Sequence, residues 1–166
     1  SPIQFKSGNF AQMVVNALAA SRLTASRLEL EITEAVLIRD DEAALSVLHR
    51  LRGLGVRIAL DDFGTGYSSL SYLQRFPFDK IKIDRSFIKD VADTDGSFAI
   101  VQAVVNIAKS RNITTTAEGV ETEQQLEVLR TVGCTEMQGY LFSPAKPAKE
   151  IKQLILQQGR RAASAA

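Results

Sequence analysis

Apolar positions along the chain follow two spacings, one typical of helices and one typical of buried strands. Where apolar residues recur every three or four positions, the pattern predicts a helix with one buried face. Short runs of β-branched and apolar residues instead predict strands covered on both faces, as in a parallel sheet. Helices are predicted at residues 10–18, 40–51, 68–75, 97–110, 123–132 and 148–156, and strands at 28–32, 56–60, 80–83, 113–117 and 135–138.

Capping signals mark several of the predicted helix ends. Asn9 with Gln12, and Thr122 with Gln125, have the spacing of a capping box, in which two side chains satisfy free backbone N–H groups. Gly133 follows the helix that begins after Thr122, at the position where a left-handed residue ends a helix. These signals predict the start of the first helix and both ends of the helix between the last two strands.

Strands and helices alternate along almost the whole chain. Such alternation indicates right-handed βαβ crossovers and a parallel sheet. No stretch rich in proline and glycine divides the 166 residues, so a single α/β domain is predicted. The length is below the roughly 200–250 residues of a complete (β/α)8 barrel.

Composition excludes several classes of protein. Apolar residues make up 45% of the chain and charged residues 23%, as in an ordinary globular domain. The net charge of +1 and the lack of a basic stripe disfavour nucleic-acid binding. No apolar run approaches the length of roughly 20 residues that a membrane span needs. The single cysteine, Cys134, excludes an intrachain disulfide and a cysteine-rich zinc site, and the single histidine, His49, has no second histidine with which to form a metal site. Both residues are interpreted as structural.

Polar residues stand at the carboxyl end of each predicted strand. Because the carboxyl ends of parallel strands meet at one edge of a sheet or barrel, active sites form there, and these side chains are expected to converge. Ordinary exposure at the strand ends is the alternative for any one of them. The residues are Glu31, Asp61, Asp62, Lys82, Asp84, Glu118 and Gln138.

Four of these residues form a hard-oxygen ligand set. The carboxylates of Glu31, Asp61, Asp62 and Glu118 favour Mg²⁺ or Mn²⁺ over zinc. Adjacent aspartates face opposite ways on an ideal strand, but both can converge where the chain turns. A pair of metal ions at such a site suits phosphodiester hydrolysis. Lys82 then orients water or neutralises charge on the phosphate; the alternative is an ion pair with a neighbouring acid.

A glycine-rich loop follows the paired aspartates. Gly64-Thr65-Gly66 resembles a phosphate-binding loop, but the GxxxxGK[ST] pattern of a P-loop is absent. The loop is therefore interpreted as a sharp, flexible turn after the strand.

In these motifs the sequence resembles the EAL domain family of bacterial cyclic-di-GMP phosphodiesterases. The separations between Glu31, Asp61, Lys82, Glu118 and Gln138 are 30, 21, 36 and 20 residues, in the family's order. The resemblance extends from Ser1 to about Ile155. The matching stretches are Glu31-Ile-Thr-Glu34, Asp61-Asp-Phe-Gly-Thr-Gly66, Lys80-Ile-Lys-Ile-Asp84, Ala117-Glu-Gly-Val-Glu-Thr122 and Gln138-Gly-Tyr-Leu-Phe142.

The resemblance implies hydrolysis of one phosphodiester bond of cyclic di-GMP to linear pGpG, with two Mg²⁺ or Mn²⁺ as cofactors. It implies an incomplete TIM-type barrel of about five parallel strands with flanking helices. The implied metal ligands are Glu31, Asp61, Asp62 and Glu118, with Asp61 bridging both ions.

Further roles follow from the same resemblance. Catalytic roles are implied for Lys82, which holds water, for Glu118 and for Gln138, which supports the metal-water network. Lys82 and Gln138 are also the expected substrate contacts. Glu121 is the expected anchor of the loop after Asp62, a loop whose position is tied to dimerisation in the family.

The sequence departs from the family pattern at its beginning. The Glu-Ala-Leu tripeptide, the arginine after it and a metal-binding asparagine are absent from the chain. Residues 1–158 are therefore expected to be the C-terminal portion of an EAL domain, and residues 159–166 a tail that is disordered or derived from cloning. Impaired or absent phosphodiesterase activity is expected. A non-catalytic cyclic-di-GMP-binding regulatory module is the alternative, and an unrelated TIM-barrel enzyme is disfavoured.

An open sheet would leave unpaired edges at the strands around residues 28–32 and 135–138. Self-association through these edges or through the loop after Asp62 is therefore expected, with a local rearrangement that covers the edges as the alternative. No membrane or nucleic-acid partner is expected for this chain. A cytoplasmic location is expected, while the parent protein is free to carry membrane or sensor domains.

Overall fold

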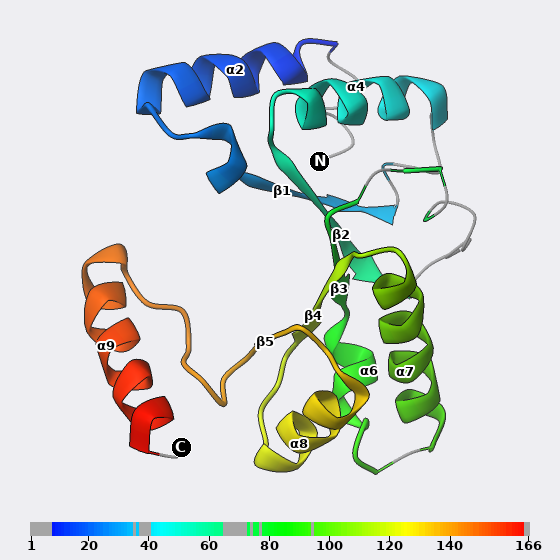
Figure 1. Cartoon of the computed structure of the whole chain (residues 1–166), viewed down its shortest axis with the longest axis vertical. Helices are drawn as coiled ribbons and strands as arrows, with labels where there is room; N and C mark the ends of the chain where they lie inside the picture. Colours follow the sequence, from blue (N-terminus) through cyan, green and yellow to red (C-terminus); the bar gives the residue numbers. More distant parts are fainter. Residues whose placement is uncertain are drawn as a thin grey trace.

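Five parallel strands form one sheet in the order β1-β2-β3-β4-β5 (Figure 1). The computed structural model describes residues 8–34, 36, 41–64, 73, 75–76, 78–93 and 95–164. Within that part of the chain the sheet is open, because β1 and β5 each pair with one neighbour only. The strands are β1 (Glu29–Thr33), β2 (Arg57–Phe63), β3 (Lys80–Ile83), β4 (Thr114–Glu118) and β5 (Glu136–Gln138).

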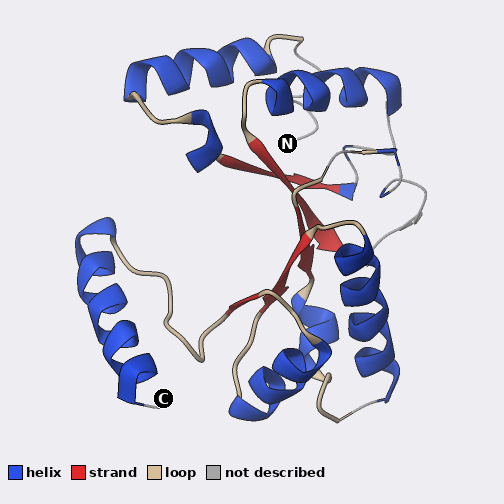
Figure 2. Cartoon of the chain, in the orientation of Figure 1, coloured by secondary structure: helices blue, strands red, loops and turns tan. Residues whose placement is uncertain are grey.

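Helices cover one face of the sheet, and Figure 2 shows α9 standing apart from them. None of the described helices combines the length and the apolarity that a membrane crossing needs. The helices are α2 (Phe10–Ser21), the 3-10 helix η1 (Ala25–Arg27), α4 (Asp41–Gly53), α6 (Arg85–Lys89), α7 (Asp95–Ser110), α8 (Glu123–Val132) and α9 (Ala148–Ser164).

The two faces of the sheet differ in chemistry because side chains alternate along each strand. On the helix-covered face, Ile58, Leu60, Ile81 and Ile83 are buried and join the hydrophobic core. The helices contribute Leu48 and Leu51 of α4, Val101 and Val105 of α7, and Leu126 and Leu129 of α8 to the same core. The opposite, concave face carries the charged residues that alternate with them, so the apolar positions fix which way the charged positions point.

The predicted parallel α/β fold is confirmed. Strand β3 has the predicted bounds of residues 80–83, and the other strands differ by one to three residues at their ends. The capping box of α8 is also confirmed: Thr122 and Gln125 exchange hydrogen bonds, and Gly133 ends the helix at φ 83°. The helix predicted over residues 68–75 lies largely outside the described residues.

Two details of the helices differ from the predictions. Asn9 precedes α2, but its side chain makes no capping hydrogen bond, and Gln12 donates instead to Asn16 Oδ1 at 3.1 Å. The backbone of Asn9, at φ −102° and ψ 5°, is not in the extended conformation that a capping side chain requires. Helix α9 runs to Ser164, into the segment expected to be a tail, because alanine and arginine residues there favour helix.

Asp84 caps the short helix α6 directly after β3. The backbone N–H and the Oγ of Ser86 donate to Asp84 Oδ1 at 2.9 and 2.6 Å. Burial opposes the charge on Asp84, but hydrogen bonds from Ser86 and Arg85 outweigh it and lower the pKa of Asp84. The ionised form of Asp84 is therefore the one that stabilises the fold.

Replacing Asp84 with Ala is expected to lower the free energy of unfolding by about 1 kcal/mol at pH 7, the usual effect of losing a capping side chain. The lowered pKa means that this contribution is present above the unfolded value of 3.8 and is lost as the pH falls through the folded value. Urea unfolding of the wild type and the variant at pH 7 and pH 3 measures it. If the stability difference between wild type and variant is larger at pH 3 than at pH 7, the capping role of Asp84 is wrong. Asp93→Ala removes an aspartate at an exposed position and is the control.

Candidate metal centre

Polar side chains from four strands meet around Lys82 on the concave face of the sheet. Lys82 lies on the central strand β3, and only 9% of its side chain is exposed. Its Nζ atom is 2.9 Å from Glu31 Oε1 on β1, 2.9 Å from Asp61 Oδ1 on β2 and 2.8 Å from Glu118 Oε1 on β4. The structure therefore brings three of the four predicted metal ligands to one ammonium group.

The three carboxylates keep Lys82 charged. Burial is the largest single influence and favours the neutral amine, but hydrogen bonds to Glu118, Asp61 and Glu31 together outweigh it, so the pKa of Lys82 is raised above 10.5. The alternative given for Lys82, an ion pair with a neighbouring acid, is therefore present in the structure. Its role in holding water stays a prediction.

Asp61 and Asp62 converge because the end of β2 is irregular. The pairing of β2 with β3 shifts register between Leu60 and Phe63, and Asp62 adopts φ 55°, a left-handed backbone that breaks the alternation of side chains. One carboxylate oxygen from each of Asp61, Asp62 and Glu118 lies within 4.8 Å of the others. The expected convergence of the two aspartates at the strand end is confirmed.

The clustering of acids around Lys82 leaves Asp62 in an unfavourable electrostatic environment. The pKa of Asp62 is raised, first by burial and then by the nearby charges of Asp61 and Asp84, while Lys82 acts in the opposite direction. Three closely spaced carboxylate oxygens, without a sulfur or imidazole ligand among them, match the donor chemistry of Mg²⁺ and Mn²⁺. The described residues therefore fit a divalent cation. Glu31 is not one of these three residues, but its carboxylate pairs with the same Lys82 ammonium that Asp61 and Glu118 contact.

Glu34 holds the start of the loop after Asp62. The Gly64 N–H donates to Glu34 Oε1 at 3.2 Å, and Glu34 is buried. Gly64 has φ 98°, and a Cβ atom there would lie 2.7 Å from Phe87 Cε2, so the position requires glycine. Glu34 has no predicted role from the sequence, although a second acid three residues after Glu31 is a signal that points to it.

Glu121, the expected loop anchor, is exposed. Its backbone N–H donates to Gln125 Oε1 at 2.8 Å, within the capping structure of α8. Glu34, by contrast, contacts the described start of the loop through the Gly64 N–H. The anchoring role of Glu121 stays a prediction, because residues 65–72 lie outside the described part of the chain.

Gln138 ends β5 opposite Glu118 in the register of β4 and β5. Its carbonyl accepts the Val120 N–H at 3.0 Å, and the Leu141 N–H donates to the Val120 carbonyl at 3.0 Å. A Cβ atom on Gly139 would lie 2.1 Å from that carbonyl oxygen, so only glycine allows the two loops to lie this close. These backbone bonds fix the end of β5, and with it Gln138, beside the end of β4.

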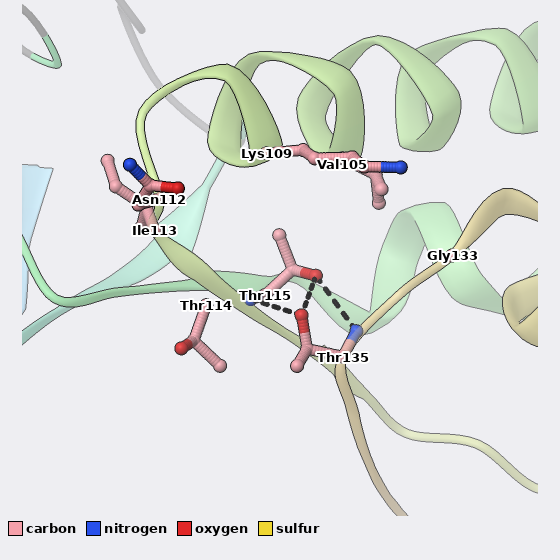
Figure 3. Close-up of a pocket in the computed structure, with 8 residues that line it drawn as sticks. All are labelled: Val105, Lys109, Asn112, Ile113, Thr114, Thr115, Gly133 and Thr135. Atoms are coloured by element: carbon pink, nitrogen blue, oxygen red, sulfur yellow. Dashed lines mark hydrogen bonds between the residues drawn. The ribbon is translucent and has the colours of Figure 1, made fainter.

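A second hollow lies at the opposite, amino-terminal edge of the sheet. This groove of about 390 Å³ lies between α7 and the starts of β4 and β5 (Figure 3). Thr115 and Thr135 hydrogen-bond to each other at its base, and no carboxylate lines it. This groove therefore lacks the carboxylate ligands of the carboxyl-end cluster.

Comparison with known proteins yields a consistent set of relatives. The EAL domain family model matches residues 1–145. The chain is 44% identical over 151 residues to the bifunctional diguanylate cyclase/cyclic di-GMP phosphodiesterase MucR of Pseudomonas aeruginosa. That match covers 91% of this chain and 22% of MucR. The chain thus spans about a fifth of the length of the curated relatives that it matches.

Two solved structures have the same arrangement of strands and helices. A cyclic-di-GMP complex of the P. aeruginosa MucR phosphodiesterase superposes with a TM-score of 0.86 at 44% identity, covering 91% of this chain and 61% of that one. The EAL domain of Mycobacterium smegmatis DcpA gives a TM-score of 0.89 at 38% identity, covering 95% of this chain and 70% of that one. The incomplete TIM-type sheet expected from the sequence agrees with these neighbours.

Proposed function

We propose that this chain, which belongs to the EAL domain family, acts in the metal-dependent hydrolysis of cyclic di-GMP to linear pGpG. The observation that carries the proposal is the group of carboxylate oxygens from Asp61, Asp62 and Glu118 within 4.8 Å, beside the buried ammonium of Lys82. Further support comes from MucR, a relative that is named as a cyclic di-GMP phosphodiesterase and solved in complex with cyclic di-GMP.

Each residue of the cluster has a proposed task. Asp61, Asp62, Glu118 and Glu31 would hold two Mg²⁺ or Mn²⁺. Such ions, when bound, polarise the phosphate and make a bound water more acidic. Lys82 keeps its proton and donates hydrogen bonds, which orients water or stabilises negative charge that develops on the phosphate. Gln138 offers an amide at the rim for the substrate and the surrounding water.

Direct assay of the purified chain tests the proposal. Cyclic di-GMP is incubated with the protein and Mn²⁺, with and without a chelator, and pGpG is quantified by ion-exchange chromatography, while calorimetry measures cyclic-di-GMP binding. We expect binding with slow, metal-dependent formation of pGpG. Binding of cyclic di-GMP by the wild-type chain without any turnover, with or without Mn²⁺, would instead identify a non-catalytic cyclic-di-GMP module, and the absence of both binding and turnover would overturn the proposal.

Self-association is a further part of the proposal. β1 and β5 are edge strands in the described sheet, and edges with free backbone groups favour pairing with another chain. Light scattering after size exclusion should show a species larger than the monomer, and a monodisperse monomer would contradict it. We also propose a cytoplasmic location for this chain.

A further inference from the structure

A second charged layer lies beneath the carboxylate cluster on the concave face. Lys80 precedes Lys82 by two residues on β3, so both side chains point to the same face. The Lys80 Nζ atom is 2.9 Å from Glu29 Oε1 and 2.8 Å from Glu136 Oε2. Lys80 therefore makes two ion pairs of its own, separate from those of Lys82.

The partners of Lys80 lie on the two outermost strands. Glu29 belongs to β1 and Glu136 to β5, whereas Lys80 is on the central strand β3, two strands from each edge. In a flat sheet, β1 and β5 would each lie roughly 9–10 Å from β3, on opposite sides, since adjacent strands are about 4.7–4.9 Å apart. One lysine can reach carboxylates from both directions only if the sheet curls around it.

Burial makes these contacts important to the fold. Only 13% of the Lys80 side chain is exposed, and the Thr116 hydroxyl donates to the same Glu136 oxygen at 3.0 Å. Burial disfavours the ammonium of Lys80, but hydrogen bonds to Glu136 and Glu29 outweigh it and raise its pKa. Arg57 also lies 3.8 Å from Glu29 Oε2, but its side chain is half exposed. Removing Lys80 therefore takes away the buried cation that both acids contact, and the network is sensitive to its loss.

The edge strands also carry the site. Glu31 is two residues beyond Glu29 on the same face of β1, and Gln138 is two residues beyond Glu136 on β5. Gln138 in turn pairs in register with Glu118. The positions of Glu29 and Glu136, which Lys80 holds, therefore also fix the residues two places further along β1 and β5. Those residues lie at the level at which the acids surround Lys82.

We propose that Lys80 is a positioning residue that ties β1 and β5 to β3 and thereby sets the curl that brings Glu31 and Glu118 together above it. The effect on metal binding rests on the proposed function, whereas the effect on the sheet does not. Lys80 itself contacts neither the substrate nor the ions.

The curl is tested directly by distances between the two edges. Spin labels are placed at Arg27→Cys, in η1 directly before β1, and at Thr131→Cys, near the end of α8, which leads into β5. The distance between them is measured in a Cys134→Ala background by pulsed electron resonance. Lys80→Met should lengthen and broaden the distance distribution, Glu136→Gln should do so less, and Lys80→Arg should stay close to wild type. Lys146→Met, which removes a lysine from the exposed pair with Glu150, is the matched control and should change nothing.

Mn²⁺ affinity, followed by the resonance of the free ion, provides the second measurement. Lys80→Met should weaken Mn²⁺ binding by about tenfold or more, the usual effect of losing a supporting contact outside the ligand shell, with recovery in Lys80→Arg. An unchanged distance distribution in both Lys80→Met and Glu136→Gln would overturn the inference. A wild type that binds no Mn²⁺ would overturn the proposed function, and the label distances would still decide whether Lys80 sets the curl.

Discussion

Asp61→Asn is expected to remove Mn²⁺ binding almost completely and cyclic-di-GMP hydrolysis with it. Asp61, like Glu118, belongs to both parts of the site: one of its oxygens lies in the group formed with Asp62 and Glu118, and it pairs with the Lys82 ammonium at 2.9 Å. The amide has nearly the same shape as the carboxylate, but it lacks the charge that attracts a hard cation. We therefore expect a loss of Mn²⁺ affinity greater than the 10–100-fold typical of a residue outside the ligand shell.

Calorimetric titration with Mn²⁺ measures this loss, and ion-exchange chromatography of pGpG measures turnover. Asp93→Asn makes the same substitution at an exposed position and is expected to bind Mn²⁺ as the wild type does. Circular dichroism should show that Asp61→Asn retains its secondary structure. Mn²⁺ affinity within threefold of wild type would show that the cluster is a network of ion pairs and not a metal site.

The alternation of side chains made much of this site predictable. Strand β3 was predicted residue for residue because Ile81 and Ile83 must face the core, which directs Lys80 and Lys82 to the other face. The convergence of Asp61 with its neighbour followed from the same reasoning, since a strand can place both on one side only where its backbone departs from regularity. Local pattern thus determined which side chains face the site.

The partners of each charge were not predictable in the same way. Lys82 contacts acids from β1, β2 and β4, and that choice depends on the stagger and the curl of the sheet, which no local pattern encodes. Glu34 was missed for a related reason: its contact with Gly64 joins segments 30 residues apart. Asn9 failed as a capping residue because its backbone conformation, set by what surrounds it, overrode its intrinsic preference.

Lys82→Met is expected to destabilise the metal-free protein and to make its stability depend on divalent cations. Without the ammonium, the carboxylates of Glu31, Asp61 and Glu118 lose the cation that all three contact. Removing one partner of a buried ion pair costs about 3–5 kcal/mol, and partial exposure of these acids reduces this to about 2–4 kcal/mol. The raised pKa of Lys82 means that its contribution is fully present at pH 7 and is lost only as the pH rises through the folded value, above 10.5.

Mn²⁺ should reverse the destabilisation, because a bound cation replaces the missing positive charge. A concentration one hundred times the dissociation constant raises the free energy of unfolding by about 2.7 kcal/mol. We also expect Lys82→Met to bind Mn²⁺ more tightly than the wild type, in which the ammonium and the ions share the same acids, while its hydrolysis of cyclic di-GMP falls. Urea unfolding at pH 7, with a chelator and with Mn²⁺, measures the first effect and calorimetry the second. Lys146→Met, which removes an exposed lysine, is the control. If Lys82→Met is as stable in chelator as this control, the acids do not need Lys82 as their counter-ion, and the electrostatic account of the cluster is wrong.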